Sequence, residues 1–148
     1  ATLLRQISSP VARRVLLVDD DEIMREGVRR ALEQEQWEVA EAGNGRVALE
    51  QLAKADCDVI LLDLMMPEMN GFEFLVQLRQ RPEWQDIPVL VLTAKDLSAE
   101  DHRLLNGYAE RVMQKNASDL DQLLREIGRR LSGSIERGRA KKLIEETK

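Results

Sequence analysis

The sequence predicts an α/β fold in which a five-stranded parallel sheet is covered by helices on both faces. Short apolar runs of strand length alternate with amphipathic segments whose apolar residues recur at helical spacing. The chain has 148 residues, which is the usual size of one domain. Strict alternation of strand and helix favours a parallel sheet, because right-handed crossovers carry the chain over its faces.

The first part of the chain is expected to hold three strands and two helices. Residues 15–18 form a continuous apolar run, as in a strand that is buried on both faces. Apolar positions then recur at helical spacing over residues 23–32. Residues 37–40 are predicted as the second strand, residues 45–55 as the second helix and residues 59–62 as the third strand.

A loop and a third helix follow the third strand. Pro67 and the pair Asn70-Gly71 interrupt the pattern, as residues of turns and loops do. Apolar positions within residues 72–78 carry the third helix, and residues 89–92 form the fourth apolar run. That run predicts a further buried strand.

The last two units are predicted from a cap signal and an apolar stripe. Ser98 and Asp101 have the spacing of an N-cap signal and precede the apolar positions of a fourth helix. Residues 112–113 are expected to form a short fifth strand. The apolar stripe over residues 120–131 predicts the fifth helix.

Five such units favour a flavodoxin-like (βα)5 three-layer sandwich with the strand order 2-1-3-4-5. We expect residues 14–131 to form this domain, residues 1–13 to be a linker, and residues 132–148 to be a linker or helical tail. The chain begins with Ala1 rather than Met, so we expect it to be an excised module of a longer protein.

Composition argues against several classes of protein. The formal net charge of -5 argues against direct nucleic-acid binding, which needs a basic face. No apolar run approaches the roughly 18–20 residues of a membrane span, so no membrane association is expected. The single cysteine, Cys57, excludes an internal disulfide and a cysteine-based zinc site, and it fits a reducing, cytoplasmic location.

Chemically distinctive side chains follow four of the predicted strands. Asp19 and Asp20 follow the first strand, Asp63 the third, Thr93 the fourth and Lys115 the fifth. Carboxyl ends of parallel strands meet at one edge of the sheet, where α/β proteins bind their ligands. Three carboxylates gathered there would repel one another unless a cation lay between them. An all-oxygen site that shares a phosphate suits Mg²⁺.

This set of residues suits transfer of a phosphoryl group. A carboxylate can attack phosphorus and form an acyl phosphate, in a reaction that depends mostly on positioning and charge neutralisation. Mg²⁺ and the Lys115 ammonium can neutralise the phosphoryl oxygens. The Thr93 hydroxyl can donate to one of these oxygens only after transfer, and such a contact can bias a two-state element.

On these residues the chain resembles the receiver domains of bacterial two-component response regulators. The resemblance rests on the segments 15–21, 59–71 and 89–95 and on Lys115. The segment from Asp63 to Gly71 is the most specific part of it.

The resemblance implies a role for each residue of the acidic site. Asp63 is similar to the phosphoacceptor of the family. Asp20 would bind Mg²⁺ directly and Asp19 largely through water, while the backbone carbonyl of Met65 completes the protein's ligands. Thr93 resembles the switch hydroxyl.

The resemblance also implies the partners. Lys115 is similar to the lysine that contacts the phosphate. The phosphoryl donor would be a phosphohistidine on a histidine kinase or a histidine phosphotransfer domain, and the receiver itself catalyses its phosphorylation and dephosphorylation without being a separate enzyme. A homodimer through the fourth helix, fifth strand and fifth helix is a further implication.

Two departures from the family pattern bear on signalling. Lys115 is followed by Asn116 where the family usually has proline, and Val112 stands where many receivers have an aromatic switch residue. The ending of the fifth strand is similar to that of receivers attached to hybrid sensor histidine kinases, so the parent protein could be such a kinase.

Three other functions each agree with part of the sequence. A haloacid-dehalogenase-like phosphatase would use Asp19 and Asp21 but leaves Asp63 and Thr93 unexplained. A receiver-like interaction module that is never phosphorylated is disfavoured by the intact acidic set. A flavin or nucleotide binder would need a glycine-rich loop after the first strand, which the sequence lacks.

Overall fold

A five-stranded parallel sheet forms the centre of the molecule. The computed structural model describes residues 13–66, 69–94, 96–114, 125 and 127–129. The strand order is β2-β1-β3-β4-β5, which confirms the predicted order and fold class. The strands are β1 (Arg14–Val18), β2 (Glu38–Ala42), β3 (Val59–Leu62), β4 (Val89–Thr93) and β5 (Arg111–Gln114).

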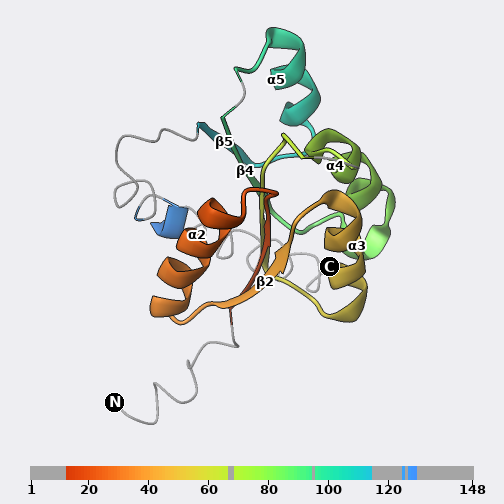
Figure 1. Cartoon of the computed structure of the whole chain (residues 1–148). Helices are drawn as coiled ribbons and strands as arrows, with labels where there is room; N and C mark the ends of the chain where they lie inside the picture. Colours follow the sequence, from red (N-terminus) through yellow and green to blue (C-terminus); the bar gives the residue numbers. More distant parts are fainter. Residues whose placement is uncertain (1–12, 67–68, 95, 115–124, 126, 130–148) are drawn as a thin grey trace.

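Helices cover both faces of the sheet. Figure 1 shows α2 on one face and α3 and α4 together on the other, with α5 projecting beyond the end of the sheet. The helices are α2 (Glu22–Gln34), α3 (Gly45–Lys54), α4 (Gly71–Gln80), the 3₁₀ turn η1 (Pro82–Trp84) and α5 (Ala99–Asn106). Of the predicted fifth helix, Arg125 and residues 127–129 are helical, and its other residues lie outside the described part of the chain.

Each of the helices α2, α3, α4 and α5 begins at a side chain that accepts a hydrogen bond from the helix's own first turn. Asp21, Asn44, Asn70 and Ser98 cap α2, α3, α4 and α5 in turn. The predicted cap at Ser98 is confirmed as a full capping box, because the Asp101 side chain accepts from the Ser98 N–H at 3.0 Å. Such caps satisfy N–H groups that have no partner within the helix.

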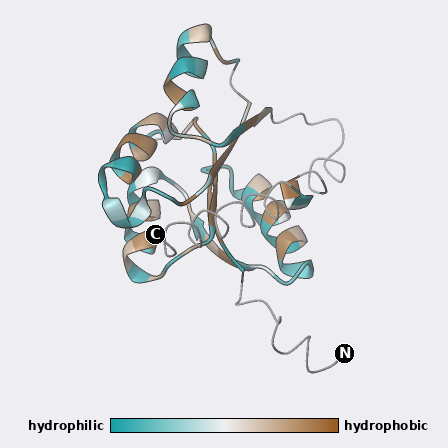
Figure 2. Cartoon of the chain, turned by 180° about the vertical axis from the view of Figure 1, so that it is seen from behind, coloured by the Kyte–Doolittle hydropathy of each residue, from teal (hydrophilic) through white to brown (hydrophobic). Residues whose placement is uncertain are grey.

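Two apolar clusters hold the layers together. Alternate strand residues point to opposite faces, so Leu16 and Ile60 pack toward α4 with Phe74, whereas Leu17 and Leu61 pack on the other face. All four residues of β3 are buried, as expected for a central parallel strand. Figure 2 shows these hydrophobic strands at the centre, between helices that carry both hydrophilic and hydrophobic residues.

The structure shifts some predicted boundaries. The second strand was expected at residues 37–40, but β2 runs from Glu38 to Ala42, because its pairing with β1 extends from Arg14↔Glu38 to Val18↔Ala42. β2 lies at the edge of the sheet, and three of its five residues are exposed or half-buried glutamate or alanine, so its apolar pattern is weak. The Trp37 N–H instead donates to Leu32 at the end of α2.

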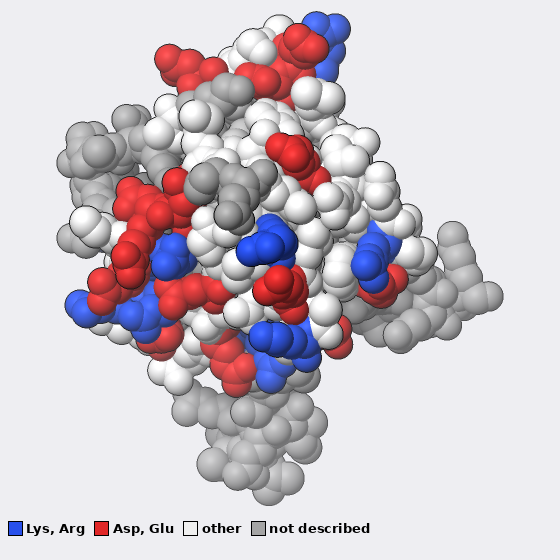
Figure 3. Space-filling view, turned by 45° about the vertical axis from the view of Figure 1, so that its right-hand side comes forward, with Lys and Arg blue, Asp and Glu red and all other residues white. Residues whose placement is uncertain are grey.

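Charged side chains on α2 are paired with one another and with β2. Arg30 lies 2.7 Å from Glu26, and Arg29 lies 3.4 Å from both Glu33 and Glu41. On the face drawn in Figure 3, acidic and basic side chains lie among one another. No helix in the described part of the chain is long and apolar enough to cross a membrane.

The region around α5 is held differently from the rest. Leu105 is the one buried residue of this helix, while Leu104 and the nearby Tyr108 are exposed. The segment that leads from α5 into β5 is tied to α4 by Arg79. This guanidinium donates to the carbonyl oxygens of Tyr108 (2.8 Å), Trp84 (3.0 Å) and Gln85 (2.9 Å).

Candidate functional site

The carboxyl ends of β1 and β3 lie side by side and carry three aspartates. Val18 is the register partner of Leu62, so Asp19 and Asp63 follow adjacent strand ends. The Asp63 N–H donates to the carbonyl of Val18 at 2.9 Å and continues the strand pairing into the site. Asp19 and Asp63 therefore meet at one edge of the sheet, as the sequence predicts.

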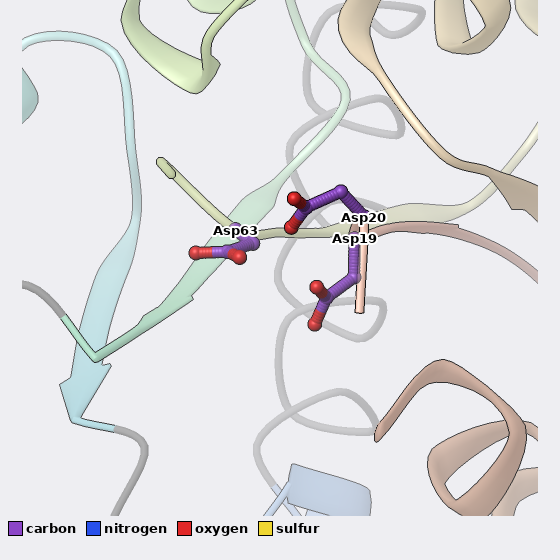
Figure 4. A group of neighbouring side chains, drawn as sticks. All are labelled: Asp19, Asp20 and Asp63. Carbon is purple, nitrogen blue, oxygen red and sulfur yellow. The ribbon is translucent and has the colours of Figure 1, made fainter. Parts of the chain in front are cut away.

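Asp19, Asp20 and Asp63 form a compact acidic cluster. One carboxylate oxygen from each lies within 4.8 Å of the others. Figure 4 shows the three side chains directed to the same side of the strand ends. Asp19 and Asp63 are only 4% and 5% exposed, whereas Asp20 is open to solvent. Buried carboxylates at this separation repel one another, and a cation that takes oxygen ligands would relieve the repulsion.

Backbone groups fix the two buried carboxylates. The Asp21 N–H donates to Asp19 Oδ1 at 2.9 Å, and the Met65 N–H donates to Asp63 Oδ1 at 3.2 Å. Each contact runs from the residue two positions further along the chain, which is a common arrangement for aspartate in turns. The side chains are therefore held in place by the loops that follow their strands.

The loop after Asp63 packs closely against two helices. The Gly71 N–H donates to the carbonyl of Leu64 at 3.1 Å, and a Cβ at position 71 would lie 2.8 Å from the carbonyl oxygen of Asp63. The Gly45 N–H, at the start of α3, donates to the carbonyl of Met69 at 3.2 Å. These glycines let the backbones approach closely, so the loop is pinned to α3 and α4.

The structure places Thr93 near this edge but describes only part of the predicted set. Thr93 ends β4, the strand next to β3, and its side chain is fully buried. Met65 is described, and 55% of its surface is exposed. Lys115 lies outside the described residues.

Arg25 is a site residue that the sequence reasoning missed. Its Nη1 donates to the backbone carbonyl of Asp19 at 2.6 Å, and its Nε lies 3.2 Å from Glu41 Oε1 on β2. The signal was available, because side chains lean toward the N-terminus of their helix. A basic residue in the first turns of α2 can therefore reach back over the end of β1.

The opposite edge of the sheet holds a separate cavity of about 230 Å³. It lies between the first residues of β1 and β2 and the end of α3, and its lining includes Arg14, Leu16, Leu52 and Cys57. Burial raises the pKa of the Cys57 thiol to about 12, with a further contribution from the negative charge of Asp58. This thiol is therefore protonated at neutral pH and a poor nucleophile.

Comparison with protein families gives one match that spans most of the chain. The family model of the response regulator receiver domain matches residues 15–128. A curated relative named response regulator MprA, from Mycolicibacterium vanbaalenii, is 40% identical over 111 residues, which are 75% of this chain and 47% of that protein. The chain thus spans about half the length of the curated relatives it matches.

Solved structures with the same architecture include receivers from two kinds of protein. The chemotaxis response regulator CheY4 of Vibrio cholerae is 32% identical, with a TM-score of 0.72 over 82% of this chain and 99% of that one. The signal receiver domain of a signal transduction histidine kinase from Syntrophus aciditrophicus is 30% identical, with a TM-score of 0.69 over 82% and 92% of the two chains.

Proposed function

This chain belongs to the response regulator receiver domains, the phosphoacceptor modules of bacterial two-component signalling, and we propose that Asp63 is the residue that becomes phosphorylated. The observation that carries the proposal is the placement of Asp63. Its carboxylate is almost buried at the end of a central strand, and it lies within 4.8 Å of the carboxylate oxygens of Asp19 and Asp20.

The same cluster is proposed to bind Mg²⁺. The donors are all oxygens and carry enough negative charge to hold a small divalent cation, so the residues present fit this ion. Asp20 and Asp63 would bind it directly, Asp19 largely through water, and the backbone carbonyl of Met65 would complete the protein's share. When bound, the ion supplies positive charge that neutralises phosphoryl oxygens.

The transfer step assigns Asp63 the role of nucleophile. One of its carboxylate oxygens forms a bond to phosphorus while the bond between phosphorus and the donor's imidazole nitrogen breaks, and the electron pair stays on that nitrogen. The Met65 N–H, which donates to Asp63 Oδ1, limits rotation of the carboxylate and so helps to orient it for attack.

Thr93 and Lys115 are proposed to respond to the transferred group. Thr93 lies one strand away from Asp63, at the buried end of β4. Its hydroxyl would donate to a phosphoryl oxygen, and the Lys115 ammonium would pair with another. Because these contacts need the phosphoryl group, they favour one arrangement of the segments after β4 and β5 over the other.

The donor and the setting follow from the family. We propose a histidine kinase or a histidine phosphotransfer domain as the phosphoryl donor, with residues 14–131 as the receiver domain. The parent protein is proposed to be either a response regulator with a separate output domain or a hybrid kinase. A cytoplasmic location and a homodimer through α5, β5 and the following helix stay predictions.

The test is phosphorylation by a small donor. Incubation with Mg²⁺ and acetyl phosphate should add one phosphoryl group to the chain, measured by intact mass, and chelation of the metal should abolish the gain. Asp63→Asn should stay unmodified. Asp56→Asn, which changes an exposed aspartate after α3, is the matched control and should be phosphorylated normally.

Two outcomes would contradict this function. A mass gain that persists in Asp63→Asn would exclude Asp63 as the acceptor, and no gain in the unchanged chain would favour the interaction module that is never phosphorylated. Turnover of a simple phosphate ester that is lost in Asp19→Asn but kept in Asp63→Asn would favour the phosphatase alternative.

A further inference from the structure

We propose that Arg25 is a positioning residue, which holds the Asp19–Asp20 turn in the conformation that binds the divalent cation. This inference rests on the proposed function and extends it to a residue outside the acidic cluster. Its basis is the 2.6 Å hydrogen bond from Arg25 Nη1 to the carbonyl oxygen of Asp19. A charged donor makes such a bond stronger than a neutral one does.

The bonded oxygen controls the direction of Asp20. The carbonyl of Asp19 belongs to the planar peptide that leads into Asp20, so a bond to this oxygen fixes the orientation of that plane. Asp19 itself is already held from two sides, because its N–H donates to Ala42 at 3.0 Å and its Oδ1 accepts from Asp21 at 2.9 Å. Arg25 adds a restraint from a side chain of α2 at the carbonyl oxygen of Asp19.

Arg25 is held at its other end by β2. Its Nε lies 3.2 Å from Glu41 Oε1, and a Cβ at Gly43 would lie 3.6 Å from its Nη1. The side chain is 19% exposed, so its position is set by these neighbours. A planar guanidinium can serve the carbonyl and the carboxylate together, and Arg25 thereby joins α2 to the ends of β1 and β2.

The contacts favour positioning over charge neutralisation. The bond from Arg25 to the site runs to a backbone oxygen, and the positive charge of Arg25 is paired with Glu41. The guanidinium can therefore lie beside the acidic cluster while the carboxylates keep their charge for the cation. Loss of Arg25 should weaken metal binding even though no carboxylate is removed.

Arg29 offers a matched control on the same helix. Its Nε lies 3.4 Å from Glu41 Oε2, so it shares the carboxylate that holds Arg25, and its side chain is 30% exposed. Its ion pairs run to glutamates of α2 and β2. Arg29→Gln removes the same formal charge from the same helix and leaves the bond from Arg25 to Asp19 in place.

The experiment measures the Mg²⁺ affinity of the full chain by calorimetry, together with the Mg²⁺ concentration for half-maximal phosphorylation by acetyl phosphate. Arg25→Gln should weaken both roughly tenfold or more, as expected when a group that orients metal ligands is removed. The Mg²⁺ affinity of Arg25→Lys should lie between those of Arg25→Gln and the unchanged chain. An ammonium can bond to the Asp19 carbonyl or to Glu41, but it lacks the separate N–H groups with which a guanidinium reaches both. Arg29→Gln should stay within about twofold of the unchanged chain, as surface ion pairs contribute little.

A purely structural role predicts a different result. If Arg25→Gln and Arg25→Lys lower the melting temperature in EDTA but bind Mg²⁺ as tightly as the unchanged chain, the positioning role is wrong. If Arg25→Gln does not fold, the affinity of Arg25→Lys decides in the same way. If the unchanged chain binds Mg²⁺ but is not phosphorylated, the proposed function is wrong. The Mg²⁺ affinities of the Arg25 variants would still decide whether Arg25 positions the metal ligands.

Discussion

The strand ends at the acidic cluster and the region around α5 are built in opposite ways. At the cluster, β3 is buried along its whole length, and Asp63 is tied by backbone hydrogen bonds to Val18 and Met65. In α5, Leu105 alone is buried, and Leu104 is 51% exposed. The first region is fixed by a buried strand and backbone hydrogen bonds, whereas α5 buries a single residue.

This difference fits the two tasks of a receiver. Phosphoryl transfer depends on positioning, so its residues belong on buried strands. A change that a partner can sense needs an element whose rearrangement costs little free energy, and such elements have few buried contacts. Arg79 connects the two regions, because α4 follows the loop of Asp63 and Arg79 holds the carbonyl of Tyr108 beyond α5.

The largest expected effect breaks the rigid region. Phe74 is fully buried on α4, and Phe74→Ala should lower the free energy of unfolding by about 3–5 kcal/mol, because it removes apolar burial and leaves a cavity. Leu104→Ala on α5 should lower it by less than about 0.5 kcal/mol. Urea unfolding followed by circular dichroism measures both. Similar losses in the two variants would show that the region around α5 is packed as tightly as the region of the acidic cluster.

A second change tests the close contact between α3 and the loop of Asp63. In Gly45→Ala the new Cβ would lie 2.8 Å from Met69 Cγ and 2.9 Å from the Met69 carbonyl oxygen. We expect a loss of about 1–3 kcal/mol in stability and slower phosphorylation, because the loop must move. Gly27→Ala is the control, since a Cβ there meets nothing within 4 Å, and it should stabilise α2 by roughly 0.5–1 kcal/mol.

A third change tests the link between the acidic cluster and the region around α5. Arg79→Gln removes the hydrogen bonds to Trp84, Gln85 and Tyr108, and we expect a loss of about 1–3 kcal/mol that affects the end of η1 and the segment between α5 and β5. Burial lowers the pKa of the Arg79 guanidinium, and the negative charge of Asp86 partly offsets this effect. The hydrogen bonds to carbonyl oxygens stabilise the charged guanidinium in its partly buried position.

Hydrogen exchange is the measurement for this link. In Arg79→Gln the amides of residues 107–111 should exchange faster, while those of β3 should be unchanged. Arg81→Gln is the control, because Arg81 lies over the Trp84 ring at 5.0 Å and its side chain is 64% exposed. Equal acceleration in β3 would show that Arg79 supports the whole domain rather than this connection.

The smallest expected effect concerns the opposite edge of the sheet. Because burial raises the pKa of Cys57 from 9.0 to about 12, its thiol should react with iodoacetamide at pH 8 far more slowly in the folded chain than in urea. Since the unfolded thiol ionises first, Cys57 stabilises the fold below pH 9, and this contribution falls as the pH rises toward about 12. Equal reaction rates in the two states would contradict the burial.

Much of the fold and the centre of the site follow from local sequence patterns. Continuous apolar runs predicted β1, β3 and β4, because strands buried on both faces consist mostly of apolar residues. The edge strand β2 was predicted to start one residue and to end two residues too early, because its exposed residues weaken the apolar pattern and its register is set by pairing with β1. The Arg25 and Arg79 contacts were not predicted, because they depend on how a helix lies against backbone from distant segments.

The pairing of β1 with β3 has a consequence for how the domain folds. Val18 and Leu62 are distant in the chain, because α2, β2 and α3 lie between β1 and β3. Contacts of such sequence separation carry a large loop-closure entropy and slow the search for the native state. The acidic cluster therefore does not exist until this crossover is complete, and three like charges then oppose its closure. If the proposed divalent cation binds only the folded state, it stabilises that state by mass action, and the gain in the free energy of unfolding grows with the logarithm of its concentration above the dissociation constant.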